Sequence, residues 1–195
     1  MENNVMKAPF VVRKYNELGE GYIKSGTNSQ KYELIDDNKY CADDFSVKLS
    51  RKQYGPVTQQ YVTVKNTSDC KLKLKQVSSA YIPGIGADGI LLWSDPRRFK
   101  VYYCFSTWQG EAQWRSASLS ELGLYRASNH SNKNVISFRS IGNQSTSIYY
   151  PMVFIEDCEL GKTWFFEIET SSNWYIEIGA DLYADSLYVE MNSAF

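Results

Sequence analysis

The chain has 195 residues and a mass of 22.4 kDa, which suits a single large domain over residues 1–195, because all-β sandwiches reach this size without dividing. Lys and Arg (21) nearly balance Asp and Glu (22), and a net charge of -1 provides no field that would attract nucleic acid or an anionic membrane. No apolar N-terminal run resembles a signal peptide, and no stretch approaches transmembrane length. We therefore expect a cytoplasmic chain with neither a nucleic-acid nor a membrane partner.

The four cysteines are isolated from one another. Cys41, Cys70, Cys104 and Cys158 form neither a close pair nor a metal-ligand spacing. In a chain of this length without an export signal, free thiols are expected rather than disulfides.

The first half of the chain reads as short strands. Residues 1–40 carry brief apolar runs broken by Gly and Asn, and residues 45–49 then alternate strictly between apolar and polar side chains. Two further runs, 60–64 and 72–77, flank residues 66–69, whose short polar side chains favour a turn. The pattern predicts a hairpin of these two runs with one solvated face.

A long aromatic strand dominates the centre of the chain, within residues 98–124. Phe99, Val101, Tyr103 and Phe105 alternate with more polar residues, as expected for a strand with one face on a core. The basic residues Arg97, Arg98 and Lys100 are interpreted as a solvated strand start.

After Thr107 the period of two stops, which predicts a polar loop. This loop carries Trp108 and Trp114 among amides, a carboxylate and a guanidinium, a combination that suits a polar ligand. For both tryptophans, packing beneath the loop is the alternative to a ligand or subunit contact.

Five more strand candidates follow, separated by turn residues: 135–138, 148–155, 163–170, 174–178 and 187–191. At least ten strand candidates and almost no helical period predict an all-β fold. The expected architecture is a large antiparallel β-sandwich, a supersandwich with long loops and little helix.

No catalytic constellation emerges from the sequence. Glu167 and Glu169 lie two apart on a predicted strand, roughly 7 Å from each other, a separation that glycoside hydrolysis could use. Any such pair has that spacing, so a solvated strand face explains these carboxylates. The single histidine, His130, lies in a polar stretch without a nucleophile motif or further metal ligands. We predict no catalytic residue, metal or cofactor.

An ordered set of short motifs resembles the N-terminal β-sandwich of family 36 glycoside hydrolases, the bacterial α-galactosidases. The resemblance extends over roughly residues 40–179. Its motifs, in chain order, are Asn66-Thr67-Ser68-Asp69, Ser79-Ala80-Tyr81, Trp108-Gln109-Gly110-Glu111, Arg139-Ser140, Tyr150-Pro151-Met152-Val153, Gly161-Lys162-Thr163-Trp164-Phe165-Phe166 and Trp174-Tyr175-Ile176-Glu177-Ile178-Gly179.

The resemblance implies that catalysis belongs to another part of a longer protein. In this family the nucleophile and the acid/base are aspartates on a (β/α)₈ barrel that follows the sandwich, and the Lys-Trp-Asp type of motif around the nucleophile does not occur in these 195 residues. We therefore expect a front domain severed from its barrel, inactive alone, with a retaining α-galactosidase-type enzyme as its parent.

The resemblance also implies substrate-binding residues. In the family, the loop that matches residues 108–111 leans towards the sugar pocket, often that of a neighbouring subunit, which assigns this role to Trp108 and also to Glu111 and Trp114. The implied partners are a galactoside or oligosaccharide substrate in the complete enzyme and further copies in a homo-oligomer. Tyr149-Tyr150 stand before Pro151 where many members have His-Asn, which leaves the sugar and its linkage open.

Two alternatives from other classes stand beside this hypothesis. The aromatic and amide side chains also suit an independent carbohydrate-binding, lectin-like module, because flat rings and planar polar groups match the two kinds of surface on a sugar. A purely structural interaction domain would bind no sugar at all.

Overall fold

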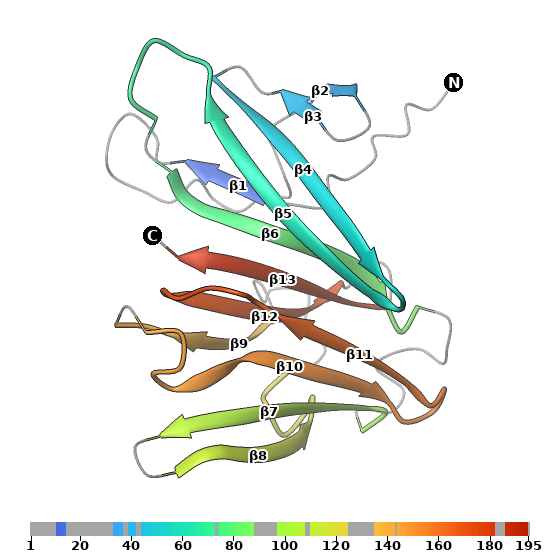
Figure 1. Cartoon of the computed structure of the whole chain (residues 1–195). Coiled ribbons are helices and arrows are strands. Elements are labelled where there is room, and N and C mark those ends of the chain that lie inside the picture. Colours follow the sequence, from blue (N-terminus) through green and yellow to red (C-terminus); the bar gives the residue numbers. More distant parts are fainter. Residues whose placement is uncertain are drawn as a thin grey trace, which may run out of the picture. The chain divides into compact units, whose positions relative to one another are not determined.

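The computed structural model describes residues 11–14, 33–36, 39–41, 44–72, 74–87, 97–107, 110–124, 135–142, 144–181 and 186–194. These residues form thirteen strands and no helix (Figure 1). Each pairing with a described register is antiparallel. The predicted all-β antiparallel fold with sandwich-like layers is confirmed. Within the described part of the chain, no helix has the length and apolar character needed to cross a membrane.

The chain forms two compact units, whose boundary falls within strand β6 (Leu74–Ile85). The first comprises Met1–Tyr81 together with Phe195, and the second comprises Ile82–Ala194. The assignment of residues 1–195 to one domain stays a prediction.

The first unit contains a four-stranded antiparallel meander. Its strands follow one another in chain order: β2 (Glu33–Asp36), β3 (Lys39–Cys41), β4 (Phe45–Tyr54) and β5 (Val57–Asn66). The alternation predicted for residues 45–49 buries Phe45, Val47 and Leu49. Partly buried neighbours complete this cluster: Tyr40, Val62, Val64, Leu72 and Leu74. In the same unit, β1 (Val11–Lys14) pairs with β6.

The predicted hairpin of residues 60–64 and 72–77 is wrong. β5 pairs with β4, and the two-residue turn between Tyr54 and Val57 closes that hairpin, helped by the positive φ of 57° at Gly55. The polar turn near residue 66 does exist, because the Ser68 amide donates to Asn66 Oδ1 (3.0 Å) and Asn66 Nδ2 donates to the Cys70 carbonyl (2.7 Å). This turn ends β5 without folding the chain back onto it.

The second unit consists of two sheets that face each other. The β7 sheet has the order β11-β10-β7-β8, with β7 (Phe99–Thr107), β8 (Gly110–Ser118), β10 (Tyr149–Asp157) and β11 (Lys162–Glu167). The β12 sheet joins three strands in the order β13-β12-β9, with β9 (Val135–Ser140), β12 (Trp174–Asp181) and β13 (Ser186–Ala194). The Tyr103 ring of β7 meets the Phe138 ring of β9 at a centroid distance of 5.0 Å, so the sheets form a sandwich.

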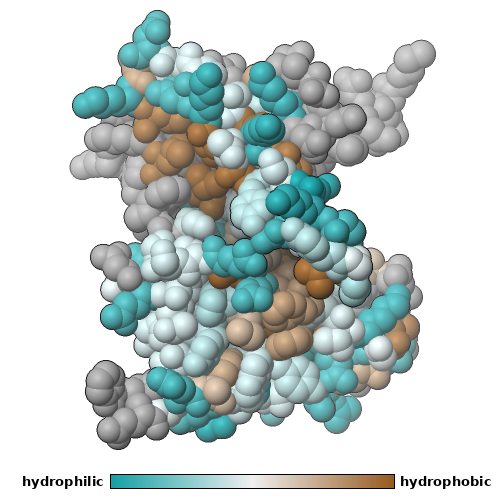
Figure 2. Space-filling view, viewed as in Figure 1, coloured by the Kyte–Doolittle hydropathy of each residue, from teal (hydrophilic) through white to brown (hydrophobic). Residues whose placement is uncertain are grey.

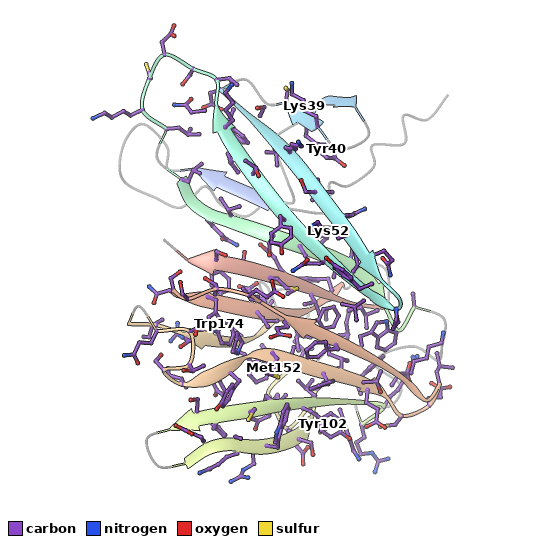
Figure 3. All side chains as sticks on the ribbon, in the orientation of Figure 1. Lys39, Tyr40, Lys52, Tyr102, Met152 and Trp174 are labelled. Atoms are coloured by element: carbon purple, nitrogen blue, oxygen red, sulfur yellow. The ribbon has the colours of Figure 1, made fainter. Side chains whose placement is uncertain are left out.

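The core of this unit lies between the two sheets. It contains Phe99 and Val101 from β7, Val153 and Ile155 from β10, and Trp174 from β12, all of them buried. The Trp174 indole N–H, labelled in Figure 3, donates to the Ser145 carbonyl (2.6 Å), which satisfies its only polar group inside the core. The strands of the β7 sheet are therefore fixed from their inner side.

A buried ion pair joins the start of β7 to the end of β10. Arg98 Nε donates to Asp157 Oδ1 (2.9 Å), and the Asp157 side chain is fully buried. Burial favours a higher pKa for Asp157, but the hydrogen bonds from Arg98 and from the Leu160 and Glu159 amides outweigh it and hold this pKa below its ordinary value. The expectation of a solvated strand start is wrong for Arg98, which is buried against Asp157. The fold brings this partner to Arg98 from a distant part of the sequence.

Candidate functional site

The predicted loop after Thr107 is largely a strand. β8 runs antiparallel to β7 with Trp114 opposite Cys104 and Gln113 opposite Phe105. The register then shifts before Thr107 and Gly110, and Ala112 has a φ of 57°, as expected for a bulge. The prediction of a loop is therefore wrong for residues 110–118: β8 is an edge strand, and its bulge breaks the period of two.

The predicted substrate-binding residues lie in different surroundings. Trp108 lies outside the described residues. Glu111 is exposed on β8, before the bulge. Trp114 is 46% exposed and packs against Phe154 of β10 at a centroid distance of 5.7 Å. The irregularity at Ala112 separates the last two residues, and the structure describes no contact between their side chains.

A hydrogen-bonded turn anchors the far end of β8. Ser118 donates to Glu121 Oε2 from its amide (2.6 Å) and from its hydroxyl (2.8 Å), and the Glu121 amide donates to Ser118 Oγ (3.3 Å). These bonds from Ser118 hold the pKa of Glu121 below its ordinary value. The turn also buries Leu119 and Leu124, so β8 has a fixed position although it forms a sheet edge.

Trp114 belongs to a group of rings on the side of the β7 sheet that faces away from the β12 sheet, which we call the open face. On this face Phe154 stacks obliquely on Phe165 of β11 (centroids 4.7 Å apart, planes at 35°). Strand register places Tyr102 of β7 directly opposite Phe154. We refer to Trp114, Tyr102, Phe154 and Phe165 as the aromatic row.

The Trp114 ring explains why Cys104, on the neighbouring strand, is buried. Cys104 shares the open face with Tyr102, because the two are separated by one residue on β7, yet it is only 2% exposed. Trp114 comes from one neighbour of β7 and contacts Phe154 on the other, so its ring passes over the strand at Cys104. Burial raises the pKa of the Cys104 thiol. The side chain of Cys104 therefore contributes to packing, and its thiol is not activated as a nucleophile.

Polar groups border the row. The Tyr102 hydroxyl donates to Glu156 Oε2 (2.5 Å). This hydrogen bond, together with some burial, raises the pKa of Tyr102. Register places Lys100 opposite Glu156. A hydroxyl, a carboxylate and an ammonium group therefore lie along one side of the rings.

The described residues offer no other chemical site. Glu167 and Glu169 are both exposed, which confirms that they are solvated, although β11 ends at Glu167 and Glu169 lies beyond the strand. All four cysteines are free, as predicted. No group of His, Cys, Asp or Glu in the described part of the chain could hold a metal ion, and His130 lies outside that part. The open face thus combines partly exposed rings with hydrogen-bonding groups.

Sequence reasoning missed Phe154, Phe165, Tyr102 and Glu156. One signal was available for Phe165: the alternation that buries Phe166 and Ile168 places Phe165 with Glu167 on the wet face of β11, where a large ring is unexpected. The same period places Phe154 and Glu156 together on β10. Their assembly into one row follows from the register of four strands, which no local pattern specifies.

Comparison with known proteins supports the fold alone. No protein-family model matches the chain, and no curated protein matches it in sequence. The structure is similar to that of the alpha-galactosidase from Lactobacillus brevis, with a TM-score of 0.57 and 12% sequence identity over 93% of this chain and 22% of that enzyme. The chain thus spans about a fifth of the length of the enzyme it resembles, and it shares its fold with part of a bacterial alpha-galactosidase.

Proposed function

We propose that the chain is a non-catalytic β-sandwich domain of an α-galactosidase-like glycoside hydrolase. The observation that carries this proposal is the structural similarity over 93% of the chain to about a fifth of an alpha-galactosidase. The sequence motifs that resemble the front sandwich of family 36 enzymes support it independently, because they occur in the family's order along the chain. Bond cleavage would then belong to a barrel domain.

Within this proposal, the connection between β7 and β8 forms one wall of the sugar pocket through Trp108, and also through Glu111 and Trp114. The exposure of Glu111 and Trp114 supports this role. So does the position of β8, which β7 fixes along one edge and the Ser118–Glu121 hydrogen bonds fix at its end. A rigid strand pair can hold a wall residue in a reproducible place.

Kinetics of the complete enzyme on an aryl α-galactoside test the wall. Trp108→Ala and Glu111→Ala should each lower kcat/KM at least tenfold, while Lys65→Ala, an exposed residue on β5, should leave it unchanged. The isolated chain should show no turnover. Unchanged kinetics in both wall variants would remove them from the site, and turnover by the isolated chain that a single substitution within it abolishes would refute the non-catalytic role.

The proposal includes a homo-oligomer formed through this domain. The tip of the β4–β5 hairpin supports it with exposed apolar surface, since Tyr54 and Val57 are 57% and 53% exposed and lie opposite each other. A second copy is the occupant that the resemblance implies. Light scattering should give more than the mass of one subunit for the complete protein, and Tyr54→Ser with Val57→Ser should lower that mass if the hairpin carries the contact.

A second candidate function is an independent carbohydrate-binding module. The observation in its favour is the aromatic row, a set of partly exposed rings bordered by hydrogen-bonding groups. Calorimetry of the isolated chain tests this candidate, because an independent module binds oligosaccharide by itself, and the kinetics of the complete enzyme test the pocket wall separately.

A further inference from the structure

The open face of the β7 sheet differs in composition from an uncovered core. The inner positions of β7 and β10 carry Phe99, Val101, Val153 and Ile155. The paired open positions of the four strands contain no Leu, Ile or Val: they are Lys100, Tyr102, Cys104, Trp114, Ser116, Ser118, Met152, Phe154, Glu156, Thr163, Phe165 and Glu167. Figure 2 shows hydrophobic colouring over β10 and β11 bordered by pale and hydrophilic residues. The face therefore combines rings with polar groups, and aliphatic side chains are missing from it.

The rings form a twisted platform across the strands. Phe154 and Phe165 come from neighbouring strands, which lie about 4.8 Å apart, and their ring centroids are 4.7 Å apart. Trp114 comes from β8, on the other side of β7, and its ring centroid lies 5.7 Å from that of Phe154. The planes are tilted by 55° and 35° relative to one another, so the rings do not form one flat surface. Such a platform suits a single chain whose successive units turn relative to one another better than it suits a flat crystalline surface.

The polar border fits a ligand with many hydroxyl groups. Glu156 and Glu167 supply carboxylate acceptors on the two sides of the row, and Ser116 and Thr163 supply hydroxyls. These two carboxylates outnumber the one ammonium group on the face, that of Lys100 opposite Glu156, so the net negative charge disfavours an anionic ligand at short range. A pyranose offers an apolar ring face to an aromatic side chain and hydroxyl donors at its rim, so its two kinds of surface match the two kinds of group present here.

We propose that the aromatic row is a binding site for a neutral oligosaccharide, with sugar rings on Trp114 and Phe165 and hydroxyl groups on the Tyr102–Glu156 pair. The inference rests on the carbohydrate part of the proposed function, but it places recognition on the open face, where Phe154 and Phe165 lie, and it does not require Trp108 or Glu111. In this site Trp114 stacks on a sugar ring of the open face. The bulge at Ala112 lies between Trp114 and Glu111 along β8.

Isothermal titration of the 195-residue chain with stachyose, cellotetraose and tetragalacturonate tests the site. At least one neutral probe should bind, and the acidic probe should bind at least tenfold more weakly than it. Phe165→Ala should weaken binding of the neutral probe about tenfold, as expected for the loss of one stacked ring, whereas Phe165→Tyr should retain it. Tyr61→Ala, which removes a similarly exposed ring from the other unit, serves as the matched control and should have no effect.

Several outcomes would overturn the inference. They are the absence of binding by both neutral probes, equal or tighter binding of tetragalacturonate, and neutral binding that survives Phe165→Ala together with Trp114→Ala in folded protein. A self-association that Phe165→Ala abolishes, without sugar binding, would assign the face to a second copy. The kinetic test of Trp108 and Glu111 in the complete enzyme is separate, so failure of the open face and failure of the pocket wall are distinguishable.

Discussion

Both faces of the β7 sheet carry aromatic rings, but the rings of one face hold the sandwich together and those of the other remain accessible. On the inner face, Tyr103 and Tyr149 pack around Phe138 of the opposite sheet, at centroid distances of 5.0 and 5.5 Å. On the open face, Trp114 and Phe165 keep 46% and 44% of their surface exposed. Aromatic residues of one sheet are therefore buried or left accessible according to what lies across from them.

The largest expected loss of stability comes from removing a ring of the core between the two sheets. Phe138→Ala should lower the free energy of unfolding by about 3–5 kcal/mol, because it removes a buried ring and leaves a cavity between the two sheets. Phe165→Ala on the open face should lower it by only about 1 kcal/mol or less, because much of that ring is already in water. Urea unfolding measures both variants. Equal losses would show that the open face is a core surface and would remove the contrast between the faces.

The next prediction concerns the buried ion pair between Arg98, at the start of β7, and Asp157, at the end of β10. Arg98→Met leaves the buried Asp157 carboxylate without its main partner and should lower the free energy of unfolding by about 3–5 kcal/mol at neutral pH. Arg97→Met, at an exposed neighbouring position, is the matched control. Denaturant titration should show little change for the control, and a similar loss in both variants would refute a specific role for the pair.

The same pair predicts a dependence of stability on pH. Because the pKa of Asp157 is lower in the folded protein than in the unfolded chain, its contribution is complete above the unfolded value of about 4 and is lost as the pH falls through the folded value. The free energy of unfolding, measured from neutral to strongly acidic pH, should fall over that range. Asp157→Asn should show a smaller fall, and an identical acid dependence in the variant would contradict the assignment.

The sequence predicted the inner face better than the open face for a physical reason. Burial imposes a period of two, so the alternation from Phe99 to Phe105 identified the core side of β7 directly. The period failed at β8, where the bulge at Ala112 shifts the register and an edge strand tolerates polar residues on both sides. It also misplaced the first hairpin, because the polar turn at Asn66 looked like a hairpin turn while Gly55 supplied the real one.

The candidate site shows the same limit. Trp114 was identifiable from its chemistry, a large ring among polar neighbours. Phe165 could have been assigned to the wet side of its strand by alternation, but its proximity to Phe154 requires the pairing of β10 with β11. Arg98 was misread as solvated for a similar reason, since Asp157 is brought to it by the fold. Local patterns identify faces of strands, and contacts between faces depend on register.

The smallest expected loss of stability comes from the Tyr102–Glu156 hydrogen bond on the open face. Tyr102→Phe removes the hydroxyl that donates to Glu156 and should lower the free energy of unfolding by about 1 kcal/mol or less, since the pair is only half-buried. Because that hydrogen bond raises the pKa of Tyr102, an ultraviolet titration of tyrosine absorbance should lose one late-ionising group in Tyr102→Phe and should show that group ionising earlier in Glu156→Gln. The sign follows from linkage: a raised folded pKa contributes stability below the unfolded value near 10, and this contribution is lost as the pH rises through the folded value. If neither variant changes the alkaline end of the titration, Tyr102 and Glu156 do not form this hydrogen bond in solution, and the open face presents two separate polar groups to a ligand.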